Sequence, residues 1–223
     1  SQMKPFSILH RLRGAFALTA VASIALIPAT SSALDPKLVP SIGADTGRFT
    51  LPISCQISVA GIKLIKIPAT VDIQGIAPVQ LGPGQEFYLS QGSGALTLGA
   101  WLSTLGGLVT ANAADAVVTS LRIGATRSTP AMVDLAKLYD LSVKDVPITF
   151  GQPITVGLPK TGDFRVGPYV APADGRIQFQ FQGASADVTI KTKLKLNVKV
   201  HAECQASQGN ALLSVAVGNN VDS

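Results

Sequence analysis

Apolar and polar residues alternate strictly over Phe49–Val59, and this pattern constrains the fold more than any other feature of the chain. Every odd position there is apolar or cysteine, and every even position is Thr, Pro, Ser or Gln. Such patterning is typical of a strand with one buried and one solvated side. Pro52 cannot donate a ladder hydrogen bond, so we expect this strand at a sheet edge or at a bulge. After Ala60-Gly61, residues 62–74 are predicted to form its hairpin partner.

The C-terminal half shows the same alternation. Residues 172–175 (PADG) are a turn signal, and residues 176–182 then alternate between apolar side chains and glutamines. Residues 183–187 (GASAD) are predicted to turn the chain into a second strand, 189–204 (TIKTKLKLNVKVHAEC), whose even positions are apolar or small. We expect these two strands to pair, with glutamines and lysines on one outer face.

The only two cysteines, Cys55 and Cys204, each fall on the apolar side of a predicted strand. Both sulfurs should therefore point into the core. An even cysteine count in a chain bound for an oxidising compartment is typical of a disulfide. We predict a Cys55–Cys204 bond that joins the first strand of the domain to one of the last.

The compartment is inferred from residues 1–33, which resemble a secretory signal peptide. A basic segment (Lys4, Arg11, Arg13) precedes the apolar run 14–29, and Ser31-Ser32-Ala33 suits cleavage after Ala33. Ser1 and Gln2 precede Met3 and are left out of this interpretation. We expect residues 34–47 to be a flexible segment, 48–218 a single domain and 219–223 a tail. No second apolar run of ~20 residues is present near the C-terminus to act as a membrane anchor.

Charge argues against nucleic acid as a partner. The chain has 18 basic and 13 acidic residues, but cleavage after residue 33 would leave 15 and 13, a net charge of only +2. Nucleic-acid-binding domains usually carry a strongly basic face. The predicted strand 189–204 does carry a lysine row, either the ordinary solvated side of a strand or a contact for anionic envelope polymer or lipid headgroups. The modest charge favours the solvated side; the lysines are Lys191, Lys193, Lys195 and Lys199.

The middle of the chain is almost uncharged. Between residues 74 and 114 the only formal charge is Glu86. Within it, residues 96–109 place large apolar side chains at helical spacing, and this is the candidate apolar-ligand region: Trp101, Leu102, Leu105 and Leu108. A filled core would explain the same residues, and we prefer that interpretation; an exposed apolar patch would mark a binding site.

A short helix is predicted from Thr129-Pro130 to Leu141. Threonine suits the N-cap and proline the first helical position. Its buried stripe would be Met132, Leu135, Ala136 and Tyr139.

Four segments together resemble uncharacterised secreted β-sandwich domains of actinobacteria. They are the strand with Cys55, "IPATVDIQG" (67–75), "GALTLGAWLSTLGGL" (94–108) and the strand with Cys204, and the resemblance spans roughly residues 45–205. It implies a β-rich fold in an envelope or extracellular setting, with no assigned catalytic residues. The expected fold is thus mainly β, an antiparallel β-sandwich with one or two short helices and one disulfide.

Motifs for common chemistries are missing from the sequence. His201 is the only histidine after residue 33, and we expect it to be an exposed strand residue. There is no G-x-S-x-G elbow, no phosphate-binding loop and no dinucleotide fingerprint. We expect no catalytic residue, no metal site and no cofactor.

Three function classes remain. We favour a non-enzymatic secreted or envelope-associated module, structural or adhesive. The first alternative is a carrier or sensor of an apolar or lipid ligand, for which an internal apolar cavity would be the decisive observation. The second is a hydrolase whose scattered carboxylates the fold brings together. The oligomeric state stays open.

Overall fold

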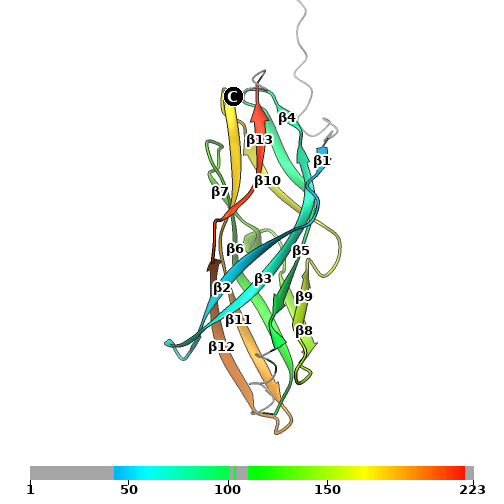
Figure 1. Ribbon diagram of the computed structural model, residues 1–223, viewed down its shortest axis with the longest axis vertical. Coiled ribbons are helices and arrows are strands. Elements are labelled where there is room, and N and C mark those ends of the chain that lie inside the picture. Colours follow the sequence, from blue (N-terminus) through cyan, green and yellow to red (C-terminus); the bar gives the residue numbers. More distant parts are fainter. Residues whose placement is uncertain (1–42, 101–102, 104–109, 219–223) are drawn as a thin grey trace, which may run out of the picture. The chain divides into compact units, whose positions relative to one another are not determined.

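The computed structural model describes residues 43–100, 103 and 110–218, and these residues form a mainly β fold (Figure 1). All strands belong to one hydrogen-bonded sheet, antiparallel except for the short parallel pair β13–β4. The only helical element with described bounds is the single-turn 3-10 helix η1, Leu135–Lys137. The strands are β1 (Gly43–Asp45), β2 (Phe49–Val59), β3 (Ile62–Pro78), β4 (Gln80–Leu81), β5 (Glu86–Leu98), β6 (Ala111–Ala125), β7 (Met132–Asp134), β8 (Ser142–Pro147), β9 (Ile154–Leu158), β10 (Phe164–Val170), β11 (Gly175–Thr192), β12 (Asn197–Ala206) and β13 (Ala211–Val217).

The sheet bends over itself, so that its two halves face each other across a shared core. Its order runs β10-β5-β3-β2-β12-β11, and the far edge of β11 pairs with β6. Phe179 of β11 nevertheless makes edge-to-face contacts with Phe87 of β5, at 6.1 Å between ring centroids, and with Tyr169 of β10, at 5.5 Å. Strands at opposite ends of the order therefore pack face to face. The expected mainly β fold is confirmed, and its layers are two parts of one continuous sheet.

The N-terminal hairpin forms as predicted. β2 has the predicted bounds, and its inward residues Leu51, Ile53 and Cys55 are buried. β3 pairs with it and continues to Pro78. β2 is not an edge strand, because it lies between β3 and β12. Its pairing with β3 has a bulge, the other expected alternative, because the register shifts between Ile57 and Ser58. Pro52 is tolerated because the β2–β12 ladder ends beside it: Ala206↔Ile53 is the last pair, and the Pro52 carbonyl accepts from Ser207 N at 2.9 Å.

The predicted turn at residues 183–187 is wrong. β11 runs through this segment without reversing, although its register against β6 shifts between Phe181 and Ala184. Gly183 takes φ +109°, and a β-carbon there would lie 3.1 Å from the carbonyl oxygen of Cys204. The small residues thus mark a bulge in a strand that continues. The expected pairing of 176–182 with 189–204 is wrong for the same reason, since 176–182 pairs with β13 and β6.

The chain reverses instead at Thr192–Leu196. Thr192 is buried, its backbone N–H donates to the Leu196 carbonyl at 3.1 Å, and its hydroxyl accepts from Leu196 N at 3.1 Å. Lys195 completes the turn with φ +60°. The segment predicted as one strand is therefore the end of β11, a turn and β12, which pairs back onto β11.

The predicted helix from Thr129 to Leu141 is also wrong. Met132–Asp134 is the short strand β7 and pairs with Arg122–Gly124 of β6. Asp134 then caps η1, accepting from Ala136 N at 3.2 Å and from Leu121 N, across the ladder, at 2.8 Å. Backbone pairing with β6 thus replaces the first helical turns. Of the predicted buried stripe, Leu135 is in the core, whereas Met132 is 46% exposed.

The hydrogen-bonded carboxylate of Asp134 should make the stability of the protein depend on pH in the acid range. Burial by itself raises its pKa, but hydrogen bonds from Leu121 N, the Ser120 hydroxyl and Ala136 N outweigh this, so the pKa is lowered. A carboxylate whose pKa is lower in the folded state stabilises the protein at pH values above its unfolded-state pKa of about 4. This stabilisation disappears as the pH falls through the folded-state pKa. We expect Asp134→Ala to destabilise the protein by ~1–2 kcal/mol at pH 7, as for a lost cap.

Urea unfolding of wild type and D134A at pH 7 and near pH 3 checks this expectation. The difference in free energy of unfolding should shrink at the lower pH. Asp140→Ala removes an exposed carboxylate to which the described residues make no hydrogen bond, and it should change stability at neither pH. A D134A effect of equal size at both pH values would show that the carboxylate charge does not contribute.

Candidate functional site: an apolar cavity between the halves of the sheet

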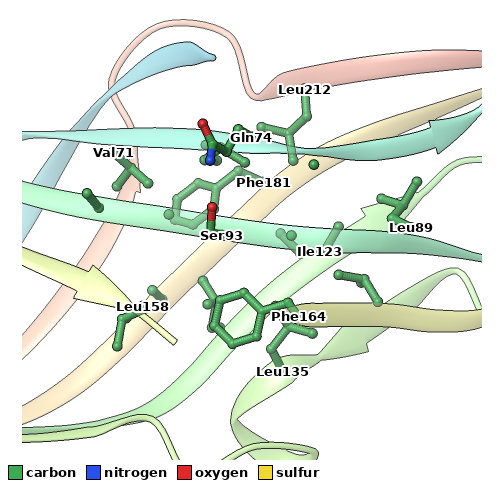
Figure 2. Close-up of a pocket in the computed structure, with 18 of the residues that line it drawn as sticks. Val71, Gln74, Leu89, Ser93, Ile123, Leu135, Leu158, Phe164, Phe181 and Leu212 are labelled. Atoms are coloured by element: carbon green, nitrogen blue, oxygen red, sulfur yellow. The ribbon is translucent and has the colours of Figure 1, made fainter. Parts of the chain in front are cut away.

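An apolar cavity of about 180 Å³ lies between the two halves of the bent sheet. Figure 2 shows labelled side chains from both halves pointing into this space, among them Leu89 of β5, Ile123 of β6 and Phe181 of β11. The lining also includes Phe49, Ile53, Val71, Ile73, Ile76, Leu96, Val118, Leu121, Leu135, Leu158, Phe164, Val166, Leu212 and Leu213. Together with Cys204 of β12, these residues place the walls on β2, β3, β5, β6, η1, β9, β10, β11, β12 and β13.

Small residues on facing strands create the space. β11 contributes Ala184, Ser185 and Ala186 to the lining, and β5 contributes Gly92 and Gly94. Gly92 also has a packing role, because a β-carbon there would come within 3.2 Å of the Phe164 β-carbon. The hollow thus forms where large inward side chains, which fill the neighbouring core, give way to alanine, serine and glycine.

The electrostatic character of the lining is neutral. No Asp, Glu, Lys or Arg is among the described lining residues, and the polar side chains among them are those of Thr46, Gln74, Ser90, Ser93 and Ser185. The Thr46 hydroxyl is already engaged, donating to the Gly75 carbonyl at 3.1 Å. A charged group would be strongly disfavoured in such a site, because burying an unpaired charge is costly. The cavity suits an uncharged apolar group.

Apolar side chains that line an unfilled space lack packing contacts on that side. A bound apolar group would restore the missing contacts.

Part of the almost uncharged segment 74–114 lines this cavity. It supplies Gly75 and Ile76 of β3, and Leu89, Ser90 and residues 92–96 of β5. Trp101, Leu102, Leu105 and Leu108 lie outside the described residues. The lining from β6, β11 and β13 is not predicted from the sequence. The available signal is the run of small residues Gly183–Ala186, whose composition is also that of a turn.

The predicted disulfide is confirmed and forms part of the cavity wall. Cys55 and Cys204 are directly opposite each other on β2 and β12, with an S–S distance of 2.05 Å. Cys55 is in the core and Cys204 also lines the cavity.

The predicted lysine row on one strand face is wrong, because the segment reverses. Lys191, at the end of β11, forms ion pairs with Asp115 of β6 at 2.8 Å and Asp145 of β8 at 2.7 Å. Hydrogen bonding to Lys191 lowers the pKa of Asp115, and the same bonds raise the pKa of Lys191. Lys193 and Lys195 lie in the turn, and Lys199 lies on β12. Lys191 thus has a structural partner, unlike a free docking cation.

His201 lies in a row with Ser58 and Asp187 across β2, β12 and β11. Its Nδ1 is 2.7 Å from an Asp187 oxygen, while its Nε2 is 3.8 Å from Glu203. The Ser58 hydroxyl donates to the His201 carbonyl oxygen at 3.4 Å rather than to the ring. The row therefore lacks the serine–imidazole hydrogen bond on which nucleophile activation depends. Among the described residues no three His, Cys, Asp or Glu side chains gather as metal ligands.

Comparison with known proteins adds no assignment: no protein-family model, curated protein or solved structure matches the chain. Within the described ranges no helix is both long and apolar enough to span a membrane.

Proposed function

We propose that this protein is a non-enzymatic module that holds the apolar part of a small ligand inside its β-sheet core and acts outside the cytoplasm, in the secreted or envelope fraction. The observation that carries the proposal is the 180 Å³ cavity with an uncharged, predominantly apolar lining. It favours the carrier or sensor over a purely structural or adhesive module, for which a filled core would suffice.

Size defines the ligand class. An apolar cavity of ~150 Å³ in another protein core accommodates a benzene molecule and otherwise stays dry. The present cavity is slightly larger, so it suits one aromatic ring or a short stretch of acyl or isoprenoid chain. A larger amphiphile would place only its apolar end here and leave its polar end outside.

The hydrolase alternative has less support. Carboxylate chemistry requires two acids facing one substrate bond, and the part of the lining that the structure describes contains none. The Asp115–Lys191–Asp145 cluster does bring two acids together, but the lysine between them holds both as ion-pair partners.

Adjacent valines on β6 provide a matched test. Val118 lines the cavity, whereas Val117 is 49% exposed. Val118→Phe should fill the space, so we expect at least a tenfold weaker affinity for benzene and n-hexanol, together with a higher Tm. Val117→Phe adds the same ring outside and should bind like wild type. Binding is measured by ligand-induced shifts of the methyl NMR signals of the lining residues.

Mass spectrometry of organic extracts complements this test. Wild type and V117F, purified from an exporting host, should carry an apolar compound that V118F lacks. Absence of probe binding by folded wild type, or equal binding by V118F and wild type, would contradict the proposal.

A further inference from the structure

The tips of two hairpins expose large apolar side chains to solvent. At the β2–β3 tip, Ile62 is 67%, Leu64 61% and Ile65 45% exposed. At the β11–β12 tip, Leu194 is 71% and Leu196 61% exposed, and Val198 follows at 39%. These six residues are half of the large apolar side chains that are exposed in the described structure. Clustering of this kind is typical of an interaction surface, unlike single exposed leucines.

Lysines are interleaved with these apolar residues. The β2–β3 tip carries Lys63 and Lys66, and the β11–β12 tip carries Lys193, Lys195 and Lys199. Residues 59–66 and 193–199 contain no acid. None of these five lysines takes part in an ion pair among the described residues, in contrast to Lys191. Both tips are therefore apolar and positively charged together.

The two tips lie beyond the same end of the β2–β12 ladder. The terminal pair at this end is Ser58↔His201, and from there β2 continues into the β2–β3 tip while β12 leads back to the β11–β12 tip. In Figure 1 the β2–β3 tip points to the left and the β11–β12 tip lies at the bottom. The other end of β3 lies far away, because its 17 residues at ~3.3 Å each span about 55 Å. One surface can thus meet both tips without touching that end.

We propose that these two tips dock the protein on an anionic phospholipid membrane. The leucine and isoleucine side chains enter the region below the headgroups, and the lysines reach the phosphates with their apolar stems buried and their ammonium groups in water. Each lysine near an anionic surface contributes on the order of fivefold in affinity. An anionic polymer would satisfy the lysines but would leave the six apolar side chains in water, so the membrane fits both observations better. The proposal stands independently of the cavity, since no residue of either tip lines it.

Vesicle co-sedimentation tests the proposal on the exported protein, whose N-terminus is first read by mass spectrometry so that all variants are compared in one form. The vesicles are mixed phosphatidylglycerol–phosphatidylcholine and pure phosphatidylcholine. Wild type should bind the mixed vesicles at low salt. It should dissociate from them near 1 M salt, because the Debye length there is only ~3 Å and the charge attraction is screened. We expect L194S/L196S and I62S/L64S each to weaken binding at least tenfold, and K193Q/K195Q about thirtyfold.

V79S/M132S is the matched control. Val79 and Met132 are 61% and 46% exposed and lie outside both tips, so this variant should bind like wild type. Circular dichroism and urea unfolding verify that every variant is folded. Wild type that fails to bind the mixed vesicles at low salt would overturn the proposal. Loss of binding in the lysine variant alone, with both apolar variants unaffected, would overturn it in favour of a polyanion contact.

Discussion

Replacing Cys55 and Cys204 together with alanine should lower the free energy of unfolding by about 5 kcal/mol. The disulfide links residues 149 positions apart. In the chain-entropy model, closing such a loop lowers the entropy of the unfolded chain and raises its free energy by about 5 kcal/mol. Domains are typically stable by 5–15 kcal/mol, so the variant should be marginal at 25 °C. Loss of the two buried sulfurs adds to the effect.

Urea unfolding of wild type, C55A/C204A and wild type under strong reductant separates the contributions. The reduced wild type keeps its sulfurs, so its loss measures the cross-link alone, and the alanine variant should be the less stable of the two. In both, residual native protein should keep its β-type circular dichroism spectrum, because β2 and β12 remain paired by backbone hydrogen bonds. A loss below 1 kcal/mol in both would contradict a role for the bond in stability.

The strands that the sequence predicted best are those with local alternation. Over β2, and over the start of β11, apolar residues occupy every second position. They are buried over residues 51–55 of β2 and 177–181 of β11, and partly buried at the two ends of β2. The cysteine pairing followed from the same parity, since both sulfurs had to face inward. These features depend on the two faces of single strands, and a sequence displays them directly.

The wrong predictions concern segments whose structure depends on strands distant in the chain. The segment Gly183–Ala186 has the composition of a turn, and only β6 and β12 on either side make it a bulged strand. Met132, Leu135, Ala136 and Tyr139 have helical spacing, but Met132–Asp134 pairs with β6, and this pairing satisfies the backbone instead. The alternation in 189–204 hides a reversal at Thr192, where a local hydrogen bond with Leu196 closes the hairpin.

The cavity could be anticipated only in part. An uncharged segment from residue 74 was visible, but whether its side chains fill a core or border a space depends on what faces them. Val118 of β6 and Ala184 of β11 are more than sixty positions apart in sequence and share the wall opposite β5. Volume left between facing strands is a property of their packing, and periodicity carries no information about it.

Replacing Phe179 with alanine should lower the free energy of unfolding by about 3–5 kcal/mol. Phe179 is fully buried, and it contacts the aromatic pair of Phe87 and Tyr169, which are stacked with centroids 5.7 Å apart on the opposite half of the sheet. The substitution removes a full aromatic side chain and both edge-to-face contacts, each of which contributes ~0.5–1.5 kcal/mol beyond burial. Phe150→Ala is the matched control: Phe150 is 68% exposed, and its loss should change stability by no more than ~0.5 kcal/mol.

The measurement is urea unfolding of both variants, with the slope against denaturant as a second observable. The slope should stay near the wild-type value if F179A keeps the bent sheet, because it reports the surface exposed on unfolding. A much smaller slope would mean that β5 and β10 no longer pack on β11 in the native state. An F179A loss as small as that of F150A would contradict the face-to-face packing itself, and with it the apolar space between the layers on which the proposed ligand binding depends.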